Sequence, residues 1–473
     1  MAQAVLPAIE SVVPTSFSKG YRAWLLIVLM LTNALNLADR QCLAAVSQAI
    51  KIDIRLTDLQ LGIIQGFGFA IFYSAFGLPI ARLSEHFSRT KIIATSIGLF
   101  GVMVSLCSTA ASAGRLLLFR IGVGVGDAGF GPPVASLIGD HFKMDRRASA
   151  MSIIWLGAPA GVVFGSMFGG WMAEHYTWRR AFVVIGALGL VVSAIAFLTL
   201  REPRRGMSDP GAAVSGRPPP TREVLRFLFS KPSMRHILIG CGLAATSMNG
   251  IGQFFGQFLI RNYHIGFAEA GRLLSLVAGI GMASGLALGG FGVDWAGRFD
   301  KRWYAWGPAV TLILSAPFFV LGFNQTTAVA AVGFLIAAHV VLFVYYTPTM
   351  AIAQNMVGAS MRASSGFLVA LVIGLVGIGL GPTLVGFLSD MYATHSFTLG
   401  KYAAMCPKGL PPAGAAADLA AACRDASATG IRYALMTTAL VPIWGAMHYL
   451  MGARTVRQDL ETLYVPKTVS PAV

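Results

Sequence analysis

Long apolar stretches separated by short polar breaks occupy almost the whole sequence, and this pattern leaves few folds open to the chain. A helix needs about 20 apolar residues to cross the ~30 Å hydrocarbon core of a bilayer. Only 12% of the residues are charged, whereas soluble domains carry about 25%. The sequence therefore predicts an all-α membrane protein. Its twelve transmembrane helices are expected at residues 21–50, 58–84, 90–111, 114–141, 147–175, 179–200, 234–262, 267–296, 302–323, 327–355, 363–391 and 429–453.

The formal net charge of +16 does not indicate a nucleic-acid-binding protein, because the cations are shared unevenly between the two sides of the predicted spans. Lys and Arg crowd the loops on one side, at 82–91, 143–147 and 298–302. The positive-inside rule makes this side cytoplasmic, where cations also meet anionic headgroups. Residues Met1–Lys19 lack the features of a signal peptide. We expect a multi-pass protein of the inner (plasma) membrane, in contact with membrane lipids, with both termini cytoplasmic.

A cationic segment with three consecutive prolines divides the chain into two halves. Within it, Thr221–Phe229 is predicted to form either a short amphipathic helix on the membrane or a solvated tether. Cys406 and Cys423 share a polar loop, where an oxidising compartment permits a disulfide without requiring one. The predicted organisation is a cytoplasmic tail (1–20), an N-terminal six-helix bundle (21–200), a cytoplasmic linker (201–233), a C-terminal six-helix bundle (234–453) with an extracytoplasmic loop (392–428), and a cytoplasmic tail (454–473).

Four ionisable residues lie inside two of the predicted spans. Asp39 and Arg40 interrupt the first span, and Arg120 and Asp127 interrupt the fourth. A charge at bilayer depth costs at least ~2.5–3.5 kcal/mol on insertion scales, so such residues usually pair with each other or face a wet pathway. At 1.5 Å per residue, Asp39, Arg40 and Arg120 can meet at one level near the outer face, with Asp127 two turns deeper. This arrangement is expected of a proton-coupled transporter.

Two short cytoplasmic loops, one in each half, share a weak repeat. The first reads GLPIARLSEHFSRTK and the second GGFGVDWAGRFDKR. Each places an acid a few residues before a cation, Glu85 before Arg89 and Asp294 before Arg298. An ion pair at such a helix end can hold the cytoplasmic helix ends together in one conformation and release them in another. We expect these four residues to act as a conformational latch.

With these features the chain resembles the major facilitator superfamily. The resemblance rests on the two loops, on RIGVGVGDAG from Arg120, on the glycine-rich stretch Gly157–Gly170 and on WRRAF from Trp178. More narrowly, the chain resembles the Spinster-like branch and its bacterial relatives, and it shares features with the anion:cation symporter branch, which handles sugar acids. The segments that carry the narrower resemblance are NALNLADRQ from Asn33, GDAGFGPPVASLIGDHF from Gly126, YYTPTMAIAQNMVGASMRASS from Tyr345 and LVGIGLGPTLVGFLSD from Leu375.

The resemblance implies the major facilitator fold, with 12 transmembrane helices in two pseudo-symmetric six-helix bundles. It also implies rocker-switch alternating access and a proton-coupling cluster at Asp39, Arg40, Arg120 and Asp127. The family more often has Glu at position 127, and an Asp-Arg pair where this chain has Glu85-His86. Eukaryotic Spinster proteins move lysolipids and sphingosine-1-phosphate, although a bacterial-looking relative need not share that substrate.

Each of the four intramembrane charges has a proposed role and a plainer alternative. We expect Asp39 to bind the proton; the alternative is a static pair with Arg120 that only joins two helices. Arg120 can serve both as counter-ion and as anchor for an anionic headgroup, because its guanidinium matches carboxylate and phosphate. Arg40 can do the same or extend toward the outer interface. Asp127 is a second titratable site, a substrate contact or an intrahelical partner of Arg120.

Uncharged polar and aromatic residues complete the predicted binding site. Asn33 and Asn36 share one helix face with Asp39, where they can line the cavity or, as an equal alternative, form interhelical hydrogen bonds. Tyr345 and Tyr346 can contact substrate or, equally, serve only as packing residues. Because intramembrane charge is confined to the first half, an amphipathic substrate could place its tail against Phe254, Phe255, Phe258 and Phe343. The predicted substrate-binding residues are Asn33, Asn36, Arg120, Asp127, Trp155, Asn249, Gln253, Tyr345, Tyr346 and Thr347.

The sequence thus predicts a proton-coupled secondary active transporter of an amphipathic or lipid-like anion, with export favoured. The alternatives are a proton symporter of small organic or sugar acids and a non-transporting membrane receptor on the same fold. We expect no enzyme activity, because no nucleophile–base set is recognisable. No metal site and no cofactor beyond the coupling proton are expected, and the protein is expected to be a monomer.

Overall fold

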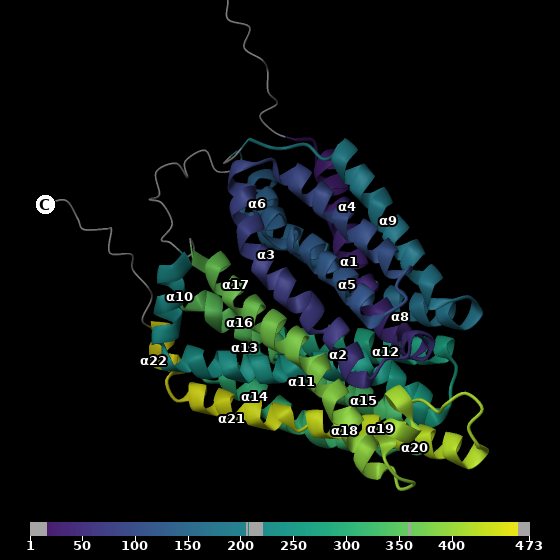
Figure 1. The fold of residues 1–473 in the computed structure, drawn as a ribbon. Coiled ribbons are helices and arrows are strands. Elements are labelled where there is room, and N and C mark those ends of the chain that lie inside the picture. The colour runs from purple at the N-terminus through teal and green to yellow at the C-terminus, as the bar shows by residue number, and fades with distance from the viewer. Residues whose placement is uncertain (1–16, 205–206, 208–220, 358–360, 462–473) are drawn as a thin grey trace, which may run out of the picture.

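The computed structural model describes residues 17–204, 207, 221–357 and 361–461, and these residues form a bundle of long helices (Figure 1). Twelve helical stretches are long and apolar enough to cross a membrane, which confirms the predicted fold class. They run over Lys19–Ile54, Asp58–His86, Arg89–Cys107, Ala113–His141, Ser149–His175, Trp178–Thr199, Pro232–Tyr263, Phe267–Ala296, Trp303–Phe323, Ala328–Asn355, Ser364–Ser396 and Ala417–Ala453.

Several of these spans are broken into shorter helices. The first half contains α1 (Lys19–Ile54), α2 (Asp58–Gln65), α3 (Phe67–His86), α4 (Arg89–Cys107), α5 (Ala113–Ala128), α6 (Gly131–His141), α7 (Met144–Trp155), α8 (Gly157–His175) and α9 (Trp178–Thr199). The second half contains α10 (Thr221–Ser230), α11 (Pro232–Tyr263), α12 (Phe267–Ala287), η2 (Leu288–Gly292), α13 (Val293–Ala296), α14 (Trp303–Phe323), α15 (Ala328–Phe343), α16 (Tyr346–Asn355), α17 (Arg362–Val372), η4 (Ile373–Leu380), α18 (Gly381–Ser396), α19 (Tyr402–Met405), η5 (Pro407–Gly409), α20 (Ala417–Thr438), α21 (Val441–Ala453) and α22 (Val456–Glu461).

The helix carrying Asp39 is placed by a glycine-lined contact. Gly157, Gly161 and Gly165 follow one face of α8 and lie against the backbone of α1; a Cβ added at Gly161 would stand 2.1 Å from the carbonyl oxygen of Ala34. Side chains larger than hydrogen are therefore excluded at this face, and the two helices approach closely, as small residues permit in membrane proteins. This contact fixes α1 against the rest of the first half.

The last span begins earlier than predicted. The extracytoplasmic loop was expected at 392–428, but α18 continues to Ser396 and α20 already begins at Ala417. The periodicity of ADLAAACRDASATG was obscured because its polar residues interrupt the apolar run, whereas its alanines favour a helix. Cys406 and Cys423 form a disulfide.

The end of the predicted linker forms a helix, α10, that packs on the second half. Val224 and Leu228, one turn apart on α10, are fully buried among residues of that half. The predicted helix is confirmed and the tether is wrong, while the position of this helix on the membrane surface stays a prediction. Figure 1 shows the first half (purple to blue) above the second (teal to yellow), with α2 beside α18 and α8 beside α12 where the halves meet.

Candidate functional site

Asp39 and Arg120 form a buried ion pair between α1 and α5. Nη1 of Arg120 donates to Oδ2 of Asp39 at 2.6 Å, and the two side chains are 1% and 0% exposed. The sequence-based prediction that the first and fourth spans meet through these charges agrees with this placement. The role of the pair in proton coupling stays a prediction.

Arg40 pairs with Asp127 rather than extending toward the outer interface. Nη2 of Arg40 donates to Oδ2 of Asp127, and Nδ2 of Asn36 donates to Oδ1 of the same carboxylate. The predicted depth of Asp39, near the outer face of the membrane, was wrong. Helix α1 continues for fifteen residues beyond Asp39, about 22 Å. Asp39 thus lies in the middle part of its helix, and the long side chain of Arg40 reaches Asp127. The alternative in which Asp127 pairs with Arg120 is not what the structure shows.

The two ion pairs balance in charge but leave hydrogen-bonding capacity unused. Among the described residues, Oδ1 of Asp39, Nε of Arg40 and Nε of Arg120 are buried without a hydrogen-bond partner. Buried polar atoms usually have partners, and those without one call for water, an ion or a ligand. With both carboxylates ionised, the four residues carry a net charge of zero, so adding or removing a single charge leaves the cluster unbalanced.

Two aromatic residues that the sequence analysis did not select surround Arg40. The guanidinium carbon of Arg40 lies 4.1 Å from the ring centre of Phe69 and 5.8 Å from that of Tyr73. The two rings are stacked, 5.5 Å apart, on adjacent turns of α3. Their four-residue spacing on the second span was the available signal, because residues four apart share a helix face. The charged cluster therefore includes a third helix.

The remaining predicted binding residues have the following placements. Nδ2 of Asn33 donates to the carbonyl of Ile154 on α7, and Nδ2 of Asn249 donates to Ala245 on its own helix. Tyr345 is fully buried, Tyr346 and Gln253 are half-buried, and the hydroxyl of Thr347 donates to Leu286. Trp155, the last residue of α7, is 53% exposed. These residues are thus spread over several helices, and only Asn36, Arg120 and Asp127 belong to the charged cluster.

Of the four phenylalanines expected to contact an apolar tail, Phe343 on α15 is half-buried and the other three are not available for that contact. Phe254, Phe255 and Phe258 are all 0% exposed. Phe258 lies edge-on to Phe323, with ring centres 5.0 Å apart, and Phe255 lies beside His339. These rings fill the interior of the second half, where helix periodicity alone could not distinguish a core face from a substrate-lining face.

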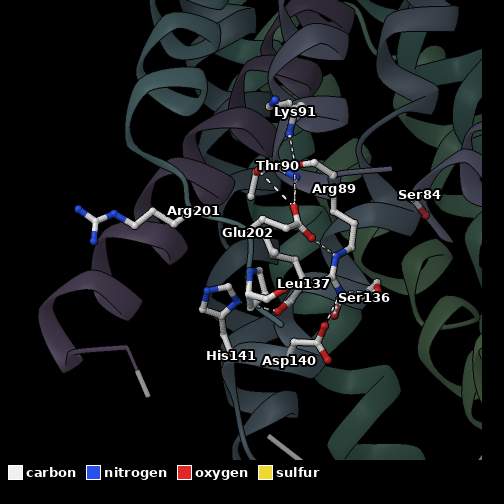
Figure 2. A network of polar contacts seen from close by, with 12 residues as sticks. Ser84, Arg89, Thr90, Lys91, Ser136, Leu137, Asp140, His141, Arg201 and Glu202 are labelled. Atoms are coloured by element: carbon white, nitrogen blue, oxygen red, sulfur yellow. Dashed lines mark hydrogen bonds and ion pairs between the residues drawn. The ribbon is translucent and has the colours of Figure 1, made fainter. Parts of the chain in front are cut away.

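The predicted latch pairs are not formed in this conformation. Glu85 is exposed, and Arg89, only 1% exposed, binds Asp140 at the end of α6 and Glu202 beyond α9 (Figure 2). In the second half, the carboxylate of Asp294 accepts a hydrogen bond from the Tyr304 hydroxyl, and Arg298 is exposed. Arg89 thus joins three segments of the first half at its predicted cytoplasmic end, and the acids that pair with it are distant in sequence.

Glu202 stabilises this junction only when it is ionised. Burial raises the pKa of Glu202, but the backbone N–H of Thr90 and the Arg89 guanidinium outweigh it and hold the pKa below its ordinary value. A carboxyl group with a lowered pKa contributes stability above its unfolded pKa, near 4.3, and loses it as the pH falls through the folded pKa.

We expect Glu202→Gln to destabilise the protein at pH 7 by about 1 kcal/mol, since the group is partly exposed. The difference from wild type should shrink only below the unfolded pKa near 4.3, toward about pH 3, where the wild-type carboxylate with its lowered pKa also becomes protonated. Thermal unfolding in detergent at both pH values measures this. Glu85→Gln, at an exposed acid nearby, should leave the melting temperature unchanged, and equal shifts in both variants would contradict the assignment.

A larger charged network, which the sequence analysis missed, joins the two halves at the opposite end. Asp58 begins α2 in the first half and accepts from Lys51 at 2.7 Å and from both Nη atoms of Arg261 in the second half at 2.7 and 2.8 Å. Ser389 also donates to Asp58, at 2.7 Å. The carboxylate of Asp390 accepts from the backbone N–H groups of residues 58 and 59. All of these side chains except Asp390 are buried.

Hydrogen bonds one turn away extend this network. Arg261 donates to Gln48 at 2.8 Å, and Gln257 donates to Ser47 at 2.9 Å, so each bond again joins the two halves. The disulfide-bonded loop lies over Lys51: a Cβ added at Gly409 would stand 3.2 Å from the Lys51 ammonium and from the Tyr402 hydroxyl. Burial and the Asp58 carboxylate raise the pKa of Tyr402. This end of the interface is therefore sealed by polar contacts.

Comparison with known proteins agrees with this architecture. The family model described as Major Facilitator Superfamily matches residues 29–382. An MFS-type efflux pump of Mycolicibacterium smegmatis is 28% identical over 78% of this chain and 85% of its own length. A hexuronate transporter of Bacillus subtilis is 23% identical over 78% of this chain and 89% of its own length. The crystal structure of a bacterial homologue of the human lysosomal transporter Spinster, inward-facing and unoccupied, is 30% identical and superimposes with a TM-score of 0.85 over 94% of this chain and 99% of that one.

Proposed function

Because the chain belongs to the Major Facilitator Superfamily and to its Spinster branch, we propose that it is a proton-coupled transporter of an anionic, amphipathic cargo. The observation that carries this proposal is the presence of two Asp–Arg contacts between α1 and α5, one fully buried and one in which Arg40 is 20% exposed. Buried ion pairs contribute little net stability, and charges inside membrane helices commonly mark proton relays or substrate paths. Asp39 and Asp127 are the proton acceptors in this proposal, and Arg120 and Arg40 are their counter-ions.

The charge balance of the cluster predicts the sense of coupling. The four residues are neutral as a set when both carboxylates are ionised, and a bound anion would make the set negative. A proton on Asp39 or Asp127 restores neutrality, so proton and anion favour each other's binding, and such linkage is reciprocal. A cationic cargo would instead compete with the proton. The charge balance therefore favours movement of an anion together with a proton, in place of the export expected from the sequence.

The network around Asp58 supports alternating access. By the positive-inside rule it lies at the extracytoplasmic end, and it joins the halves there. The similar Spinster homologue is inward-facing. We infer that the conformation described is closed to the outside and that opening requires the Asp58–Arg261 contacts to break. In this proposal the protein lies in the inner membrane with cytoplasmic termini.

Three single-chain amphiphiles with the same tail test this function. Dodecyl phosphate should enter proteoliposomes faster when the outside is acidic. Dodecyltrimethylammonium should not be taken up faster under that gradient, and dodecylphosphocholine, which has no net charge, serves as the reference. Protein-free vesicles measure passive diffusion. Flux of dodecyl phosphate that ignores the proton gradient would contradict proton coupling.

A second candidate is the cotransport of a small organic or sugar acid with a proton. It gains support because three of the four phenylalanines expected to hold a tail are buried in the core. Glucuronate uptake under the same gradient, without uptake of dodecyl phosphate, would favour this candidate. The charge argument is the same for both cargoes, since each carries an acidic headgroup.

A further inference from the structure

The guanidinium of Arg40 is held in three different ways. Its Nη2 donates to Asp127, its face lies over the Phe69 ring at 4.1 Å, and its Nε is buried without a partner among the described residues. Tyr73 extends the aromatic surface, with its ring centre 5.8 Å from the guanidinium carbon. Of these three contacts, only the one with Asp127 involves a group that can gain a proton.

We propose that Phe69 and Tyr73 position Arg40 so that, when Asp127 takes up a proton, its Nε and Nη2 edge binds a carboxylate or phosphate group of the cargo. The inference rests on the proposed function and adds the headgroup site and the residues that form it. Phe69 and Tyr73 are positioning residues, because they act through Arg40.

The aromatic surface matters most at the moment when the ion pair is lost. A guanidinium stacked on an aromatic face is attracted by the ring, by up to about 2 kcal/mol where water is excluded. A protonated Asp127 no longer holds Arg40 by charge, but the rings still do. Nε and Nη2 lie on one edge of the planar guanidinium and match two oxygens of a carboxylate or phosphate. The ionised Asp127 accepts from Nη2 of this edge and so competes with the cargo there.

Phe69 is itself firmly placed. It is 2% exposed, and a Cβ added at Gly124 of α5 would stand 2.7 Å from its carbonyl oxygen. The ring therefore belongs to a close contact between α3 and α5, the helix that carries Asp127. A rigid support of this kind reduces the ordering cost of binding.

The charged and titratable neighbours of this site are few. Asp39 and Arg120 pair with each other at 2.6 Å, and Asn36 donates to Asp127. The phenol of Tyr73 on α3 lies near Asp127 and Arg40, and the phenol of Tyr346 on α16 lies near that of Tyr73. Among the described residues, Asp127 is the acid paired with Arg40. The pH dependence of anion binding should therefore follow Asp127, since Asp39 is engaged by Arg120.

Binding of dodecyl phosphate to the full-length protein in nanodiscs tests the inference. Wild type should bind more tightly at pH 5.5 than at pH 8. Phe69→Leu should weaken binding at pH 5.5 about tenfold, and Tyr73→Leu should weaken it less. Tyr73→Phe should retain wild-type binding, because it keeps the ring.

Two controls accompany these variants. Dodecyltrimethylammonium binding should not fall in them. Phe182→Leu, at another fully buried ring of the first half, controls for loss of packing and should leave binding unchanged.

Asp127→Asn separates the positioning role from the proton. This variant should bind dodecyl phosphate tightly at both pH values, and Phe69→Leu added to it should again weaken binding about tenfold. Equal loss of phosphate and ammonium binding in Phe69→Leu, or an unchanged affinity, would overturn the inference. Absence of dodecyl phosphate binding in wild type would also overturn it, while proton-driven flux of another cargo would keep the proposed function. Dodecyl phosphate binding with the expected variant pattern, but without any proton-driven flux, would keep the inference and contradict the proposed function.

Discussion

Asp39→Asn should abolish uptake driven by a proton gradient, reducing it to the rate of protein-free vesicles. The amide has nearly the shape of the carboxylate but cannot take up a proton, so the proposed coupling step is lost. The substitution also leaves Arg120, which is 1% exposed, as an unpaired buried cation, at a cost of about 3–5 kcal/mol. Flux and thermal unfolding must therefore be measured on the same preparation.

A charge-neutral double variant separates coupling from stability. Asp39→Asn combined with Arg120→Gln removes both members of the ion pair and should recover much of the lost stability, because no unpaired charge remains. Its proton-driven uptake should stay well below the wild-type rate, because the proton acceptor at position 39 is gone and only Asp127, still paired with Arg40, can take up a proton. Proton-driven uptake near the wild-type rate in the double variant would assign the pair to a static role, the plainer alternative for Asp39.

The local pattern of the sequence was enough to predict the helices and the two charged spans, but it did not specify partners. Apolar runs and polar breaks place twelve spans within a few residues, except where α20 begins in a polar, alanine-rich stretch. The charges of α1 and α5 were recognisable because an ionised residue is rare in such runs. That Arg40 reaches Asp127, and that Phe69 supports it, depends on side-chain length and helix register.

The network around Asp58 was missed for a different reason. Lys51, Asp58 and Arg261 lie at the ends of apolar runs, where charged residues ordinarily meet water or headgroups. Their burial arises because the two halves close over them, and Asp58 and Arg261 are 203 residues apart in the chain. No periodicity or motif carries such a contact. The same limit explains Arg89, whose partners come from two other segments rather than from its own loop.

Asp58→Asn should open the outer end. In the structure Asp58 is 2% exposed and binds both Lys51 and Arg261, so removal of its charge leaves two buried cations that repel each other. Breaking a buried pair in this way costs about 3–5 kcal/mol. In a two-state equilibrium, a change of this size shifts the ratio of states by about 10²–10³-fold. The population of the outward-open state increases, because Lys51 and Arg261 can reach water in that state.

Accessibility at Ser47 reports this shift. Ser47 is 0% exposed and accepts from Gln257 across the interface, so Ser47→Cys should react slowly with an impermeant maleimide applied from outside. Adding Asp58→Asn should speed labelling at least tenfold. Asp53→Asn is the matched control: Asp53 is an exposed acid at the same end that pairs with Arg179 within the first half, and exposed pairs contribute at most about 1 kcal/mol. Labelling that is equally fast in both backgrounds would show that Asp58 does not hold the outer end closed, and the seal would then lie with the disulfide-bonded loop over Lys51.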